Sequence, residues 1–123
     1  MKQSFKNSVI CAIEGVLHTI KNERNMKIHV IIMILVVICG FVFQISFIHW
    51  MICLILFALI LSLEIINTAL EALVDLCVNE YHPLAKIAKD AAAGAVLVSA
   101  VFSAIIGIMI FVPYLLNYMK FFF

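Results

Sequence analysis

Three long apolar stretches constrain the fold of this chain more than any other feature. They run over residues 28–43, 48–63 and 91–112. An α-helix rises about 1.5 Å per residue, so about 20 residues cross the hydrocarbon core of a bilayer. The third stretch has this length by itself, and the second reaches it when the polar residues that follow are counted. Backbone in lipid must satisfy its hydrogen bonds internally, which predicts continuous helices and a tight turn at residues 44–49.

The composition supports a membrane protein rather than a soluble one. Hydrophobic residues make up 67% of the 123 residues and charged residues only 12%. A soluble fold of this size could not bury so much apolar surface. We therefore expect one all-α integral membrane domain over residues 1–123, with spans over about 28–44, 48–76 and 88–112. The net charge of +1 gives no reason to expect a nucleic-acid partner.

A further helix is predicted ahead of the spans, over about residues 4–24. Its apolar residues recur at helical spacing on one face, while its charged residues lie elsewhere. This pattern is typical of an amphipathic helix that rests on the membrane surface. Packing against a partner protein is the alternative interpretation.

The distribution of Lys and Arg predicts the orientation in the membrane. Residues ahead of the first span include Lys2, Lys6, Lys21, Arg24 and Lys27. Two more lysines lie between the second and third spans, whereas the turn at 44–49 has none. Positive charge accumulates on the cytoplasmic side. We therefore expect the N-terminus and the loop at 76–90 to be cytoplasmic.

A polar stripe interrupts the end of the second span. Glu64, Asn67, Glu71 and Asp75 point within about 80° of one another on a helix, along about 16 Å of its axis. A carboxylate inside the bilayer costs about 2.5–3.5 kcal/mol on insertion scales. Such a stripe predicts a functional site. Three helices cannot shield it from lipid, so we expect a symmetric homo-oligomer with the stripes facing inward.

The residue types of this region suit a hard cation and a phosphate. Glu23 precedes the first span, and Lys89 and Asp90 lead into the third. Carboxylates without Cys or paired His ligands favour Mg²⁺, which shares its coordination sites with water and phosphates. No Gly-rich nucleotide motif is present. From the residues alone, a membrane enzyme that uses Mg²⁺ and a small oligomeric cation or proton transporter both remain open.

The segment EIINTALEALVDL, followed by EYHPLAKIAKDAAAGAVL, resembles the prokaryotic diacylglycerol kinase family of small integral-membrane lipid kinases. The resemblance extends over nearly the whole chain, from SFKNSVICAIEG and KNERN through the third span. The HPLAKIAKDAAAGAVLVSA version of the second motif is similar to the Gram-positive branch, whose members are mostly undecaprenol kinases. His29, where the enteric enzymes carry a glutamate, points the same way.

This resemblance implies a homotrimeric lipid kinase of the bacterial plasma membrane, with its active site on the cytoplasmic side. The expected reaction is Mg²⁺- and ATP-dependent phosphorylation of the hydroxyl of undecaprenol to undecaprenyl phosphate. The alternative is a diacylglycerol kinase that makes phosphatidic acid.

The resemblance also implies roles for individual residues. Glu64 matches the catalytic carboxylate, which can act as general base, and Glu23 and Glu71 match the metal-binding pair. The positions that match nucleotide-site residues are Asn67, Asp75, Glu80, Tyr81, His82, Lys89 and Asp90. The N-terminal helix departs from the enteric pattern at Ser4, Cys11, Ile13 and Ile20. Only Glu14 and Gly15 are carried over there, as candidate lipid-site residues.

Overall fold

The computed structural model describes residues 4–123, so Lys2 lies outside the described residues. This part of the chain contains four helices and no strand: α1 (Phe5–Asn22), α2 (Arg24–Phe43), α3 (Phe47–Cys77) and α4 (Pro83–Phe122). The helices α2, α3 and α4 are long and apolar enough to cross a membrane. The prediction of an all-α protein with three candidate membrane-spanning helices is therefore confirmed.

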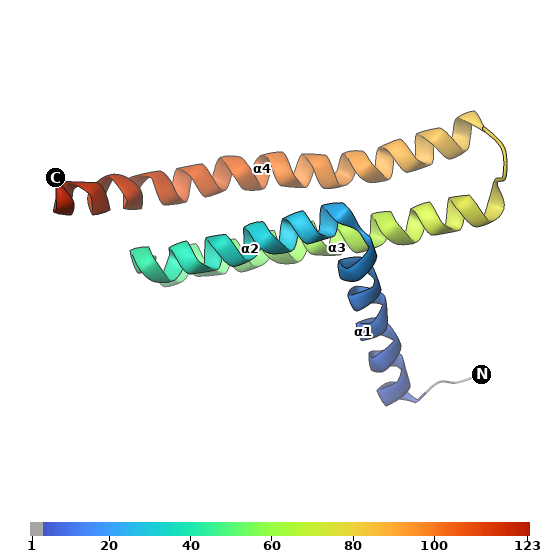
Figure 1. Ribbon diagram of the computed structural model, residues 1–123, viewed down its shortest axis with the longest axis horizontal. Coiled ribbons are helices and arrows are strands. Elements are labelled where there is room, and N and C mark those ends of the chain that lie inside the picture. Colours follow the sequence, from blue (N-terminus) through green and yellow to red (C-terminus); the bar gives the residue numbers. More distant parts are fainter. Residues whose placement is uncertain (1–3) are drawn as a thin grey trace.

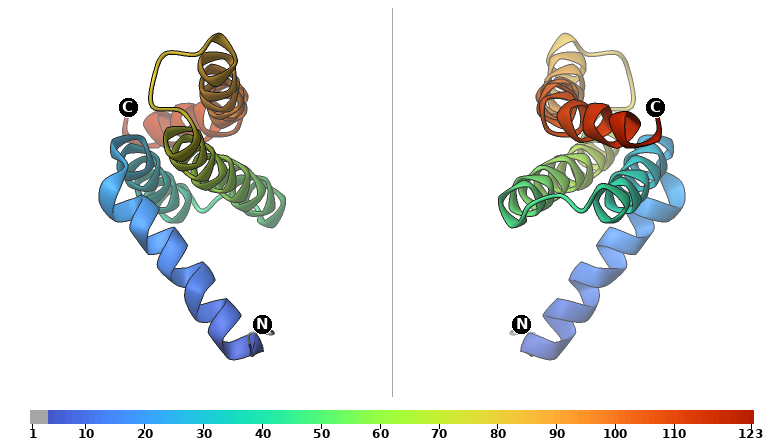
Figure 2. Two further views of the ribbon diagram at one scale, coloured as in Figure 1. Left: turned by 90° about the vertical axis from the view of Figure 1, so that its right-hand side faces the viewer. Right: turned by 90° about the vertical axis from the view of Figure 1, so that its left-hand side faces the viewer.

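The three long helices lie side by side, and α1 points away from them (Figure 1). The most extensive packing is between α3 and α4, and α2 packs mainly against α3. The views along the bundle show α1 projecting to one side (Figure 2). Large apolar side chains on the outer faces of the bundle are exposed, as lipid-facing positions require; examples are Ile31, Leu54 and Ile108.

A single residue joins α1 to α2. Glu23 has an extended backbone, and its amide donates a hydrogen bond of 2.9 Å to the Thr19 carbonyl. Thr19 and Met26 are both buried, at 2% and 1% exposed, so the junction is packed on either side. The helix expected to run to residue 24 therefore ends at Asn22, because Glu23 adopts a non-helical conformation.

The turn between α2 and α3 is shorter than the expected 44–49. Only residues 44–46 are non-helical, since Ser46 caps α3 by accepting a hydrogen bond of 3.4 Å from the His49 amide. Gln44 takes the left-handed conformation (φ 50°) that ends α2. The chain therefore reverses within three residues.

Aromatic side chains hold the helices together at this end of the bundle. The Tyr114 hydroxyl lies 2.8 Å from His49 Nδ1 and accepts a hydrogen bond of 3.1 Å from the Ser46 amide. These contacts tie α4 to the start of α3. Gly40 of α2 faces the Trp50 ring so closely that an added Cβ would lie 2.5 Å from the nearest ring carbon. Glycine is therefore required for α2 to approach Trp50 at this distance.

α4 is longer than its predicted span of 88–112. It contains 40 residues and continues through Pro113 to Phe122. At its other end Pro83 stands in the first turn, where a missing N–H costs nothing. The polar first turns, with Lys86, Lys89 and Asp90, thus belong to the same rigid helix as the apolar span. The loop between α3 and α4, expected over residues 76–90, is reduced to residues 78–82.

Candidate active site

The polar stripe of α3 turns inward, toward the other helices. Glu64 is 1% exposed and Asn67 is 6% exposed, although neighbouring Ile66 is 57% exposed. Further along the helix, Glu71 is half-buried and Asp75 is exposed. The stripe therefore leads from a buried carboxylate to solvent along one face of α3.

Two oxygen atoms of this stripe have no hydrogen-bond partner in the described chain. They are Glu64 Oε2 and Asn67 Oδ1, both buried. The Asn67 amide nitrogen donates to Glu71 Oε1 at 3.3 Å, which orients its oxygen away from Glu71. Buried polar atoms normally find partners, and leaving one unpaired is costly. The two oxygens are thus available for a ligand.

His29 of α2 faces Glu64 of α3. Its Nε2 lies 3.8 Å from Glu64 Oε2, beyond an ordinary hydrogen bond. The His29 side chain is 16% exposed, so the contact lies inside the protein. This neighbour was missed as a site residue by sequence reasoning, which used His29 only as a marker of the branch. Helical periodicity relates residues within one helix, so it could not predict this contact between α2 and α3.

Glu23 stands at the junction of α1 and α2, and Glu71 lies about two turns beyond Glu64 on α3. Within residues 4–123, no three His, Cys, Asp or Glu side chains converge closely enough to enclose a metal ion. Mg²⁺ does not need such a cage, because it is commonly held by one or two carboxylates together with substrate phosphates. The oxygen-only donor set of Glu23, Glu71 and the unpaired Asn67 oxygen therefore fits this ion.

A second group of predicted residues lines one open pocket of about 350 Å³ where α3 meets α4. Six of the seven nucleotide-site residues line it: Asp75, Glu80, Tyr81, His82, Lys89 and Asp90. Lys89 donates a hydrogen bond to Asp75, which joins the two helices. Asn67, the seventh, lies two turns deeper on α3, beside Glu71. The pocket and the polar stripe thus share Asp75 at the end of α3.

His82 also has a structural role that the sequence did not indicate. Its Nδ1 accepts a hydrogen bond of 3.1 Å from the Leu84 amide and so caps α4. The capping orients the first turn of α4 toward the pocket, and the partial positive charge of a helix N-terminus favours phosphate.

Glu14 and Gly15 lie apart from these residues. Both are exposed in the middle of α1, which points away from the bundle (Figure 1). The Gly15 carbonyl accepts a hydrogen bond of 3.0 Å from Thr19 within α1. The described chain therefore does not bring these two residues to the buried stripe.

Comparisons with known proteins agree with this arrangement. The profile of the family described as "Prokaryotic diacylglycerol kinase" matches residues 10–111. The undecaprenol kinase of Bacillus subtilis (strain 168) is 50% identical over 109 residues, which cover 89% of each chain. A diacylglycerol kinase of Synechocystis sp. is 40% identical over 106 residues, covering 85% of this chain and 61% of the relative. The chain belongs to the prokaryotic diacylglycerol kinase family, a family of membrane lipid kinases.

Proposed function

We propose that this protein phosphorylates the hydroxyl group of undecaprenol at the expense of ATP. The observation that carries the proposal is the buried, unpaired oxygen of Glu64, at the inner end of a stripe that leads to the pocket at residues 75–90. The 50% identity to the B. subtilis undecaprenol kinase favours a polyprenol as the alcohol. A lipid hydroxyl reaches Glu64 from the bilayer, and ATP reaches the pocket from water.

Glu64 is the general base in this proposal. Its free Oε2 accepts the proton of the lipid hydroxyl as the alcohol oxygen attacks the γ-phosphorus of ATP. The bond between the γ-phosphorus and the bridging oxygen breaks, and ADP leaves. Glu64 returns the proton to solvent along the polar stripe.

Mg²⁺ on the phosphates of ATP would be held by Glu23, Glu71 and Asn67. The ion would neutralise part of the phosphate charge. Lys89 places its ammonium group in the pocket, where it contributes a second positive charge to the phosphates. Tyr81 is 79% exposed and offers a ring face at the pocket edge for the adenine base. Phosphoryl transfer depends mainly on such positioning and charge neutralisation.

The assembly and orientation are part of the same proposal. Glu23 and Glu71 are half-buried and Asp75 is exposed in a single subunit, so its own helices cover these residues only in part. A homotrimer with shared sites shields them. α1 then lies on the cytoplasmic membrane surface with its apolar face in the lipid: Phe5 is 85% exposed and Ile13 is 53% exposed. The distribution of Lys and Arg supports a cytoplasmic position for the N-terminus and the pocket.

The test is a kinase assay with purified protein, Mg²⁺ and labelled ATP. Undecaprenol and diacylglycerol are offered in separate reactions at equal surface concentration. Faster labelling of undecaprenol is the expected result. Labelling of diacylglycerol alone would keep the mechanism but overturn the substrate. Labelling of neither lipid by folded protein would overturn the proposed activity.

A further inference from the structure

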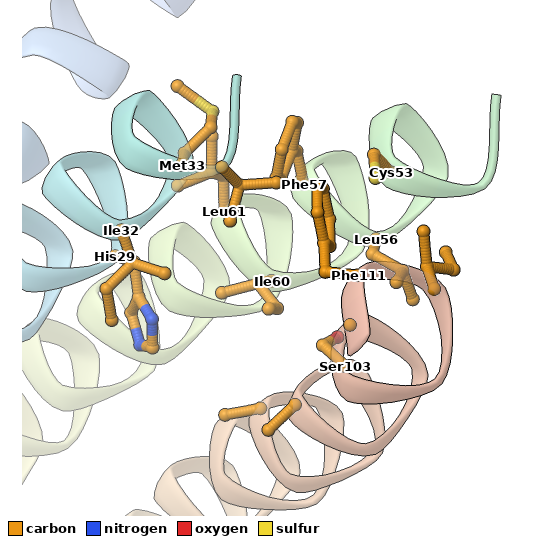
Figure 3. A pocket seen from close by; sticks show the side chains of 15 residues that line it. His29, Ile32, Met33, Cys53, Leu56, Phe57, Ile60, Leu61, Ser103 and Phe111 are labelled. Carbon is orange, nitrogen blue, oxygen red and sulfur yellow. The ribbon is translucent and has the colours of Figure 1, made fainter. Parts of the chain in front are cut away.

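An apolar cavity of about 240 Å³ lies between α2, α3 and α4, in the membrane-spanning part of the bundle. Figure 3 shows His29 at one end of it and Cys53 and Phe111 at the other. Its lining is almost entirely hydrocarbon, and the polar side chains there are His29 and Ser103. An apolar cavity of this kind does not retain water. Its occupant must therefore be apolar.

The α4 side of the cavity is built from small residues. They recur one turn apart on one face of the helix: Ala100, Ser103, Ala104 and Gly107. In membrane proteins such a face normally brings two helices into close contact. Here part of this face lines the cavity, and a Cβ added to Gly107 would meet no atom within 4 Å. The small residue at 107 therefore leaves room between the helices.

The cavity adjoins the reaction centre. His29 lines its inner end, and the same imidazole lies 3.8 Å from Glu64 Oε2. On α3 the lining begins at Leu61 and Ile60, one turn from Glu64, and continues to Cys53. The 11 residues from Glu64 to Cys53 correspond to about 16 Å of helix. A molecule in the cavity thus has one end at the proposed base and the other end deep in the bilayer.

We propose that this cavity binds the hydrocarbon chain of the lipid alcohol directly behind its hydroxyl group, with His29 as the positioning residue at its mouth. The inference rests on the proposed function and extends it. A single cavity accommodates one chain, which favours a single-chain alcohol such as a polyprenol. A diacylglycerol would have to leave its second acyl chain outside.

His29 has two contacts that suit this position. Its Nε2 faces Glu64, and its ring forms part of the cavity wall. It can therefore present a ring N–H toward the Glu64 carboxylate while the chain packs against the ring. A carboxylate in its place would set a second negative charge beside Glu64.

The cavity is tested by filling it. In the Gly107→Leu variant, the new side chain occupies the cavity, because nothing else surrounds that position. The Gly94→Leu variant is the matched control, since an added Cβ there also meets no atom within 4 Å and Gly94 is not among the residues that line the cavity. Ala104→Val is a milder filling variant for use if Gly107→Leu does not fold.

The measurement is kcat/KM for undecaprenol divided by kcat/KM for a short alcohol of two isoprene units, with ATP saturating. We expect Gly107→Leu to lower this ratio at least about tenfold, the factor expected for a modest steric misfit. Gly94→Leu should leave the ratio within about twofold of the wild type. Equal ratios in all three proteins would overturn the cavity assignment while leaving the kinase activity established.

A binding measurement separates this inference from the proposed activity. A photoreactive polyprenol is crosslinked to the protein without ATP, and the labelled peptides are mapped by mass spectrometry. If peptides of the cavity wall are labelled in the wild type but not in Gly107→Leu, the result supports the binding site, even if no alcohol is phosphorylated. No label in the wild type, together with loss of the oligomer in Gly107→Leu, would show that a second copy of the chain fills the cavity.

His29 is tested by replacement with Gln, Leu and Glu. A positioning role predicts that His29→Leu lowers kcat at least about tenfold with the KM for ATP unchanged. His29→Gln should recover part of the loss, because it restores a hydrogen-bond donor toward Glu64. His29→Glu should lower kcat at least as much as His29→Leu, because it places a second negative charge beside Glu64. An unchanged kcat in these variants would remove His29 from this role.

Discussion

The close approach of Gly40 to Trp50 gives a sharp prediction about the packing of α2 on α3. In a Gly40→Ala variant the new Cβ would lie 2.5 Å and 2.7 Å from two ring carbons of Trp50, whereas ordinary contacts begin at 3.4 Å. The ring cannot turn away freely, because the Phe41 ring packs against it at a centroid distance of 5.0 Å. The helices must therefore separate or the indole must leave its position.

The expected cost follows from two opposing effects. Overpacking of this kind costs about 1–3 kcal/mol, and replacing a helical glycine by alanine returns about 0.5–1 kcal/mol. We expect a net loss of about 0–2.5 kcal/mol in the free energy of unfolding. Gly94→Ala is the control: its Cβ meets no atom within 4 Å, so only the favourable backbone effect applies. The difference between the two variants isolates the steric cost.

Equilibrium unfolding in mixed detergent micelles measures these free energies. Trp50 is the sole tryptophan, so its fluorescence reports directly on this contact, and circular dichroism follows the helices. In a Trp50→Leu background the steric clash is gone, and Gly40→Ala should become neutral or stabilising. The resulting coupling energy should be about 1–3 kcal/mol. A Gly40→Ala variant as stable as Gly94→Ala would refute the packing argument.

Three further substitutions test the candidate active site and the hydrogen bonds of Tyr114. Glu64→Gln should lower kcat about 10²–10⁴-fold, because it removes the proposed base, while the KM for ATP stays within about twofold of the wild type; a wild-type rate would assign the base elsewhere. Glu71→Ala should raise the Mg²⁺ concentration for half-maximal activity at least about tenfold, since one charge-assisted ligand is lost, and an unchanged metal titration would count against ligation. Tyr114→Phe removes the hydrogen bonds to His49 and the Ser46 amide and should lower the free energy of unfolding by about 0.5–1.5 kcal/mol with kcat unchanged; equal stability of the two proteins would show that these bonds contribute nothing net.

Local patterns were sufficient to predict much of this fold. Hydropathy located the three apolar helices, since the bilayer imposes helix on any long apolar segment. The period of the helix placed Glu64 and Asn67 on one face, and both are buried on that face in the structure. The helix ends were less accurate. α3 begins where it does because Ser46 caps it, and α1 ends where it does because Glu23 has an extended backbone. A hydropathy pattern does not detect such single-residue effects.

Contacts between helices were beyond the reach of the sequence. The approach of His29 to Glu64 joins α2 to α3 across 35 positions, and the His49–Tyr114 pair spans 65. No periodicity links residues at such separations, because these contacts depend on how the helices pack. The pocket at residues 75–90 was partly anticipated, since its members are close in the chain and the motif of the family groups them.

In the proposed arrangement, the one-residue junction between α1 and α2 would couple the membrane surface to the chemistry. Glu23 is held by its bond to Thr19 and by the burial of Thr19 and Met26, so a tilt of α1 would carry this carboxylate with it. With α1 on the inner leaflet, as proposed, the charge and curvature of that leaflet would set the angle of α1. Lipid headgroup composition would then change the rate of turnover independently of the supply of substrate.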